Sequence, residues 1–195
     1  MRMKFNCPEG STPLEPEEIF DLIPVHITAQ AQLNVWEQRN ILLAEQWAKK
    51  KKQNIVSVDF IQKLHKYMFD QTWKWAGKFR RSGKNIGVDF HMISIELKNL
   101  CDDVNYQLEH HSFPDDEIAI RLHHRLVWIH PFPNGNGRHA RLMADLLIMQ
   151  KGLPRFSWGA TQDLYKITPI RQQYIESLRE ADRGDYSKLM DFARS

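Results

Sequence analysis

The residues from His130 to Arg141 place an ionisable base beside two glycines and two spaced arginines, in the order His-Pro-Phe-Pro-Asn-Gly-Asn-Gly-Arg-His-Ala-Arg. A neutral imidazole at the end of an apolar run can accept a proton at physiological pH, so His130 is a candidate general base. Gly135 and Gly137 carry no Cβ, which lets successive backbone N–H groups point at one anion. The 130–141 loop therefore predicts an anion-binding site next to a base.

The two arginines strengthen that prediction. Helical spacing follows the loop, which puts Arg138 in the first turn of a helix and Arg141 three residues later on the same face. A cation at a helix N-terminus opposes the helix dipole, whereas a bound anion is favoured there. A polyphosphate held by bidentate arginine contacts would account for both side chains.

The elements that must position this loop are mostly helices. Apolar spacing predicts helices over 28–50 (with Thr28 as its cap), from Ser57 onward, over 93–110, 115–129, about 137–151, 161–181 and a short one from 185. Residues 1–25 are rich in proline and glutamate and predict an extended arm with at most one short helical turn at 16–22. Turn signals within 72–92 favour a small β-hairpin or flap, at about 76–92. The expected fold is a mostly α, single-domain helical bundle with that flap.

Composition excludes several classes of protein. The chain has 195 residues, 42% hydrophobic and 26% charged, with a net charge of +3 and two cysteines. The slight positive charge suits a phosphate ligand without indicating direct binding of nucleic acid. Two cysteines give no disulfide framework, and no apolar run is long enough to span a membrane. A reduced, cytoplasmic protein without a secretory leader or a membrane partner is expected.

The 130–141 loop resembles the signature of the Fic domain, His-x-Phe-x-acid-Gly-Asn-Gly-Arg-x-x-Arg. Residues 75–88 are similar to the flap that precedes this signature in Fic proteins. Both ends of the chain, residues 8–14 and 183–186, are similar to the Fic subfamily called mobile mystery protein B. The resemblance covers nearly the whole chain and implies a Fic domain over 26–195. The signature is matched at His130, Phe132, Gly135, Asn136, Gly137, Arg138 and Arg141.

The resemblance implies transfer of AMP from ATP to a Ser, Thr or Tyr hydroxyl of a target protein. His130 would deprotonate that hydroxyl. Asn136 and its neighbouring glycines would hold the region of the α-phosphate, Arg138 the β- and γ-phosphates, and Arg141 the γ-phosphate. The flap would dock the target as an added strand through Lys84, Asn85, Ile86, Gly87 and Val88. The subfamily also implies a helix-turn-helix partner protein in a toxin–antitoxin-like pair.

Asn134 departs from the signature, which has an acidic residue that holds Mg²⁺ at this position. A neutral amide oxygen is a weaker ligand for a hard cation. The favoured consequence is weakened Mg²⁺ binding carried mainly by the ATP phosphates. The alternatives are transfer of another phosphate-containing group, or a catalytically weak nucleotide-binding or partner-binding module. An enzyme needs the base at His130, whereas a binding module does not.

Fic proteins are often inhibited by a helical glutamate that pairs with the second signature arginine. The closest candidate is Glu37, although the residues flanking it depart from the usual inhibitory motif. The resemblance predicts a pair between Glu37 and Arg141. The alternative is a solvent-facing glutamate near Arg39 and Lys49.

The remaining histidines do not predict a zinc site. His123 and His124 are adjacent on one helix and therefore point in different directions, and His139 follows the loop. They lack the spacing of zinc ligands.

Overall fold

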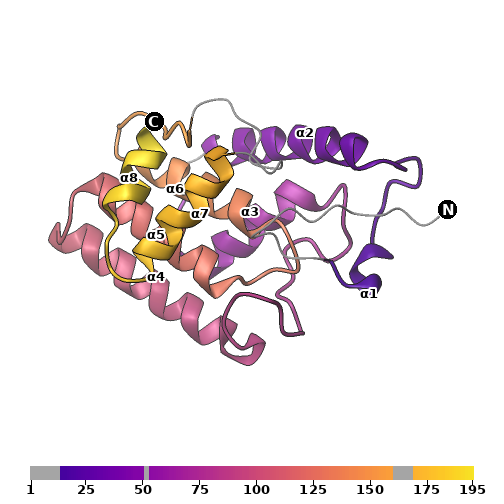
Figure 1. The fold of residues 1–195 in the computed structure, drawn as a ribbon, viewed down its shortest axis with the longest axis horizontal. Coiled ribbons are helices and arrows are strands. Elements are labelled where there is room, and N and C mark those ends of the chain that lie inside the picture. The colour runs from indigo at the N-terminus through magenta and orange to yellow at the C-terminus, as the bar shows by residue number, and fades with distance from the viewer. Residues whose placement is uncertain (1–13, 51–52, 160–168) are drawn as a thin grey trace.

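The computed structural model describes residues 14–50, 53–159 and 169–195. These residues form eight α-helices and one short 3-10 helix, and they contain no strand (Figure 1). The mostly α fold is therefore confirmed. The elements are α1 (Pro16–Ile19), α2 (Gln30–Lys49), α3 (Val58–Phe69), η1 (Phe90–Met92), α4 (Ile93–His110), α5 (Asp115–Ile129), α6 (Asn136–Gln150), α7 (Pro169–Ala181) and α8 (Ser187–Arg194).

Helices α5 and α6 form the centre of the molecule. They pack against each other, α4 and α8 pack against α5, and α2 and α3 pack against α6 (Figure 1). Both central helices bury apolar side chains, for example Leu122 and Ile129 of α5 and Met143 and Ile148 of α6. The 130–141 loop joins these two helices, so the most buried part of the fold fixes its two ends.

Local signals account for most helix ends. The Ser57 hydroxyl accepts a hydrogen bond from the Phe60 N–H at 3.2 Å, which confirms it as the N-cap of α3. Gly152 has φ +77° just beyond α6, as expected of a C′ glycine. Thr28 is not the cap of α2, because its N–H donates to the Gln32 side chain at 3.0 Å and the helix begins only at Gln30. The predicted start of a helix at residue 161 lies outside the described residues.

The flap is present, but the β-hairpin expected over about 76–92 is not formed. Its backbone groups pair with the end of α5 and the following loop instead of with each other. The Arg80 N–H donates to the Pro131 carbonyl at 2.9 Å, and the Val88 N–H donates to the Ile129 carbonyl at 3.4 Å. The Arg80 side chain also donates a hydrogen bond to the Val88 carbonyl. A hairpin ladder would need these same groups.

The N-terminal segment packs on the flap rather than extending freely. Glu18 of α1 forms an ion pair of 2.7 Å with Lys84, whose side chain is only 1% exposed. The Ile23 N–H donates to the Thr72 carbonyl at 2.9 Å. Residues 1–13 of the predicted arm lie outside the described residues. Within residues 14–25, the arm therefore contacts the flap through Glu18 and the segment before the flap through Ile23.

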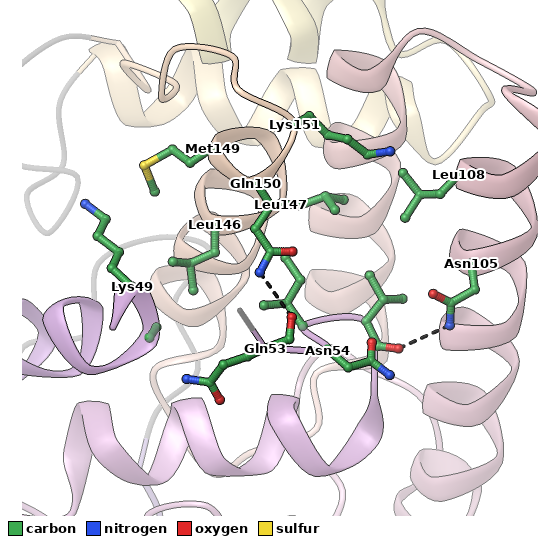
Figure 2. Close-up of a pocket in the computed structure, with 13 residues that line it drawn as sticks. Lys49, Gln53, Asn54, Asn105, Leu108, Leu146, Leu147, Met149, Gln150 and Lys151 are labelled. Atoms are coloured by element: carbon green, nitrogen blue, oxygen red, sulfur yellow. Dashed lines mark hydrogen bonds between the residues drawn. The ribbon is translucent and has the colours of Figure 1, made fainter. Parts of the chain in front are cut away.

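A pocket of about 700 Å³ lies where the end of α2, the segment leading into α3, α4 and the end of α6 meet (Figure 2). Amide side chains such as Gln53 and Asn105 mix there with apolar ones such as Leu108 and Leu146. None of the residues predicted to act on ATP lines it. Among the described residues, no helix is both long and apolar enough to cross a membrane.

Candidate active site

His130 ends α5 in the left-handed conformation, with φ +54°. Its ring Nδ1 lies 3.3 Å from the Val127 carbonyl, which can only accept a hydrogen bond. Nδ1 therefore carries the proton, and Nε2 keeps the lone pair that a general base needs. Burial lowers the pKa of His130 to about 4, so the imidazole is neutral at physiological pH.

The backbone of the 130–141 loop turns at Gly135, whose φ is +80°. A Cβ at this position would lie 2.7 Å from the Phe69 ring, so the packing as well as the backbone conformation requires glycine. Helix α6 begins at the next residue. Its first N–H groups therefore follow the turn directly, which is the arrangement expected of an anion site.

Asn136 closes the loop on itself. Its side-chain oxygen accepts from the Phe132 N–H at 2.9 Å, and its side-chain nitrogen donates to the Phe132 carbonyl at 2.8 Å. The residue is buried. Both ends of the amide are thus engaged with the backbone of the loop, so Asn136 shapes the anion site instead of presenting its amide to a ligand.

Sequence analysis did not single out His65, a buried residue of α3 that lies beneath this loop. Its Nδ1 accepts from the Gly77 N–H at 3.0 Å, so Nε2 is the protonated nitrogen and donates to the Asn134 carbonyl at 3.0 Å. The ring stacks on Phe132 with centroids 3.6 Å apart. The spacing of four from the buried Ile61 is the signal that marks His65 as an inward-facing residue.

Asn134 faces the arginine that follows it. Its side-chain oxygen accepts from the Gly135 N–H at 2.7 Å and from Arg138 Nη2 at 3.3 Å. A metal ion at that oxygen would compete with the guanidinium. No group of three His, Cys, Asp or Glu residues that could hold a metal ion occurs in the part of the chain that is described.

Arg138 pairs with Glu37 of α2. The Nη1 and Oε2 atoms are 2.5 Å apart, and the two side chains are 14% and 6% exposed. Trp73 Nε1–H donates to the other carboxylate oxygen of Glu37 at 2.7 Å. The predicted pairing of Glu37 with Arg141 is wrong, and so is the alternative of a solvent-facing glutamate. Helix α2 packs against α6, and there Glu37 meets the first of the two arginines.

Arg141 lies against α7. Its guanidinium carbon is 5.6 Å from the centroid of the Tyr174 ring. The Tyr174 hydroxyl lies 3.0 Å from His123 Nε2. The two arginines therefore lie in different environments: Arg138 pairs with a carboxylate, and Arg141 lies near an aromatic ring.

The flap residues predicted to dock a target lie beside His130. Asn85, Ile86 and Gly87 are exposed. A Cβ on Gly87 would lie 2.6 Å from the His130 Cβ, so the flap backbone touches the candidate base. Lys84 is held by Glu18, and both backbone groups of Val88 are engaged. The exposed stretch of the flap is thus shorter than the predicted one.

The other histidines are buried at separate places. His123 contacts Tyr174, His124 Nε2 lies 2.8 Å from Asp182, and His139 Nε2 lies 3.0 Å from the Ile61 carbonyl. Burial lowers the pKa values of His123 and His139 to about 3. Their polar partners are different residues, so they act as buried parts of the core.

Comparison with known families identifies the loop and its supporting helices. Residues 55–148 match the model of the Fic/DOC family. Protein adenylyltransferase fic-1 of Caenorhabditis briggsae is 32% identical over 142 residues, covering 69% of this chain and 26% of that protein. Protein adenylyltransferase Fic of Nematostella vectensis is 39% identical over 80 residues, covering 39% of this chain and 16% of that protein. The chain thus spans about a quarter or less of these relatives.

Solved structures share the fold. Fic-1 from Caenorhabditis elegans superposes with a TM-score of 0.66 at 25% identity, covering 89% of this chain and 50% of that one. BepC from Bartonella tribocorum, solved with bound AMPPNP, gives a TM-score of 0.64 at 19% identity, covering 96% and 93%. The similarity to BepC supports the fold alone.

Proposed function

Because residues 55–148 of this chain match the model of the Fic/DOC family, we propose that the protein is an adenylyltransferase that moves AMP from ATP to a Ser, Thr or Tyr hydroxyl of a target protein. The observation that carries the proposal is the placement of His130. Its ring is neutral, and its lone pair is on Nε2. The residue stands at the end of α5, at the start of the loop that leads to the first N–H groups of α6.

The proposed reaction accounts for the proton, the broken bond and the leaving group. His130 Nε2 takes the proton of the target hydroxyl while the hydroxyl oxygen attacks the α-phosphorus. The bond from the α-phosphorus to the oxygen bridging the α- and β-phosphates breaks, and pyrophosphate leaves. Negative charge that develops on the phosphate oxygens is met by the N–H groups at the start of α6 and by Arg138 and Arg141. Asn136 keeps the loop in shape for this through its two bonds to Phe132.

Magnesium would be held chiefly by the phosphates of ATP. Asn134 is the candidate protein ligand of the 130–141 loop, and its oxygen already accepts from Arg138. When bound, the ion would neutralise part of the charge on the phosphates. The weak protein contribution predicts a high Mg²⁺ requirement.

The target would dock on the exposed flap residues Asn85, Ile86 and Gly87, next to His130. An extended target segment there would present its hydroxyl directly to the imidazole. The similarity of the chain ends to mobile mystery protein B extends the proposal to a helix-turn-helix partner protein and a cytoplasmic, toxin–antitoxin-like pair.

Glu37 would hold the enzyme in a low-activity state. A nucleotide phosphate that binds Arg138 must displace a carboxylate that is buried, 2.5 Å from Nη1 and fixed by Trp73. Autoregulation would thus act on the first arginine of the loop.

The test is incubation of the full chain with lysate and ATP labelled on the α-phosphorus. The wild type should label protein, and His130→Ala should label it ~10²–10⁴-fold less, the range that a general base contributes. His110→Ala, a change of an exposed histidine on α4, is the matched control and should label like the wild type. Equal labelling by the wild type and His130→Ala, or none even with Glu37→Gly, would refute the proposal.

A further inference from the structure

Arg80 is a buried cation whose partners are backbone carbonyl oxygens. The residue is only 3% exposed. Its Nε donates to the His130 carbonyl at 2.7 Å and its Nη1 to the Ser82 carbonyl at 2.9 Å. Its Nη2 donates to the Val88 carbonyl and reaches the Ile129 carbonyl at 3.5 Å. Within the described residues it forms no ion pair with a carboxylate.

These carbonyls belong to two segments that meet over the active site. Ile129 and His130 end α5, and the carbonyls of a last helical turn have no partner within the helix. Ser82 and Val88 belong to the flap. A single guanidinium therefore satisfies the end of α5 and the flap together, at the negative end of the helix dipole.

Gly87 brings the flap as close to the base as a backbone allows. With φ +102°, it lies where an added Cβ would be 2.6 Å from the His130 Cβ and 2.8 Å from Arg80 Nη2. Arg80, Gly87 and His130 thus pack in direct contact. A displacement of the guanidinium would move both the flap and the backbone that carries the imidazole.

We propose that Arg80 is a positioning residue that locks the flap to the imidazole-bearing end of α5, so that a hydroxyl docked on the flap meets His130 at a set distance. The inference deepens the proposed function and rests on it. Lysine cannot replace arginine here, because a single ammonium cannot reach carbonyls of both segments in the fork geometry of a guanidinium.

The test compares Arg80→Lys with the wild type by NMR titration of the His130 imidazole, assigned through His130→Ala. Arg121→Lys is the matched control, since Arg121 is a partly buried arginine of α5 that pairs with Glu117. In the wild type and the control, the pKa should be about 4. In Arg80→Lys it should rise toward 6.5, because the loosened ring gains contact with water. If Arg80→Lys does not fold, Gly87→Ala replaces it and should shift the same resonances.

The second measurement is the kinetics of AMP transfer. Arg80→Lys should lower kcat for transfer to protein by about tenfold or more while the KM for ATP changes by less than about twofold, since the anion site is intact. An unchanged His130 titration in a folded Arg80→Lys chain would overturn the inference, and so would an unchanged kcat. If neither the wild type nor Glu37→Gly transfers AMP, the proposed function fails, and the titration alone still decides the role of Arg80.

Discussion

At the scale of single residues, the burial of His130 would set the pH dependence of the proposed reaction. Its pKa of about 4 lies below the ordinary value of 6.5 because the site excludes water. At pH 6 an ordinary histidine would be only about a quarter neutral, whereas His130 stays almost entirely neutral. We expect AMP transfer at saturating ATP to be nearly equal at pH 8 and pH 6. A fourfold loss over that interval would show that the imidazole titrates normally.

The proposed function makes Asn134 the residue that sets the need for metal. In Asn134→Asp, a carboxylate replaces the neutral oxygen that faces Arg138. Because carboxylates are better ligands for hard cations, the concentration of Mg²⁺ needed for half-maximal transfer should fall by about tenfold. Titration with Mg²⁺ at fixed ATP measures this concentration. Asn136→Asp is not a suitable control, because it would disrupt the hydrogen bonds of Asn136 to the loop backbone. Asn54→Asp, remote from the site and in the pocket of Figure 2, serves instead. An unchanged Mg²⁺ requirement would contradict a role for residue 134 in metal binding.

Several site residues were predictable from the sequence, and others were not. His130, the loop glycines and the two arginines could be proposed as site residues because their chemistry and spacing coincide within one short stretch. Arg80 could not be distinguished from its neighbour Arg81, since burial separates them and no local pattern does: Arg80 is buried, and Arg81 is exposed.

At the scale of elements, the proposed function has α2 control access to the anion site through Glu37. Glu37→Gln removes the charge that faces Arg138 but keeps an oxygen for Trp73. AMP transfer should rise by about tenfold or more, which is ~1.4 kcal/mol of lost competition with the phosphate. Loss of a buried charged partner should also lower the free energy of unfolding, by ~1–3 kcal/mol.

The control for that prediction is Glu45→Gln. Glu45 is a second buried glutamate of α2, and it pairs with Lys49 and Arg155 away from the loop. It should lower stability without raising transfer. Activation by both variants would mean that loosening α2, and not release of Arg138, raises the rate.

The helices could be predicted because their signals are local, as at the Ser57 cap and the Gly152 C′ position. The flap could not, because its turn signals are real but its backbone partners are the carbonyls of Ile129 and Pro131, far along the chain. The predicted partner of Glu37 was wrong for the same reason. Which of two arginines a glutamate meets depends on how α2 crosses α6, and spacing within either helix does not contain that information.

At the scale of the whole molecule, buried histidines make the fold sensitive to acid. Burial lowers the pKa values of His123, His130 and His139 to between about 3 and about 4, and that of His65 well below 6.5. The unfolded chain therefore binds more protons than the folded one below pH 6.5. The stabilisation is complete above that pH and is lost as pH falls, at ~1.4 kcal/mol per pH unit for each histidine.

Asp145 offsets one of these groups, since burial raises its pKa to about 6 and the folded state then takes up a proton as pH falls. For the three histidines with pKa values of about 3 to about 4, a net slope of roughly 3 kcal/mol per pH unit remains between pH 6 and 5. Urea unfolding at pH 7.5, 6 and 5 measures it, and His139→Gln should reduce the slope by the share of one histidine. Equal stability at pH 7.5 and 5 would contradict the burial of these rings as neutral groups.

If the protein moves AMP, a label on the α-phosphorus of ATP should reach its target protein and a label on the γ-phosphorus should not. The Glu37→Gly variant, in which Arg138 has lost its carboxylate partner, should be incubated with lysate and with ATP labelled on either the α- or the γ-phosphorus. We predict that protein acquires the α-label, does not acquire the γ-label, and gains neither in the Glu37→Gly, His130→Ala double variant. Transfer of the γ-label, or of the α-label without His130, would contradict the account.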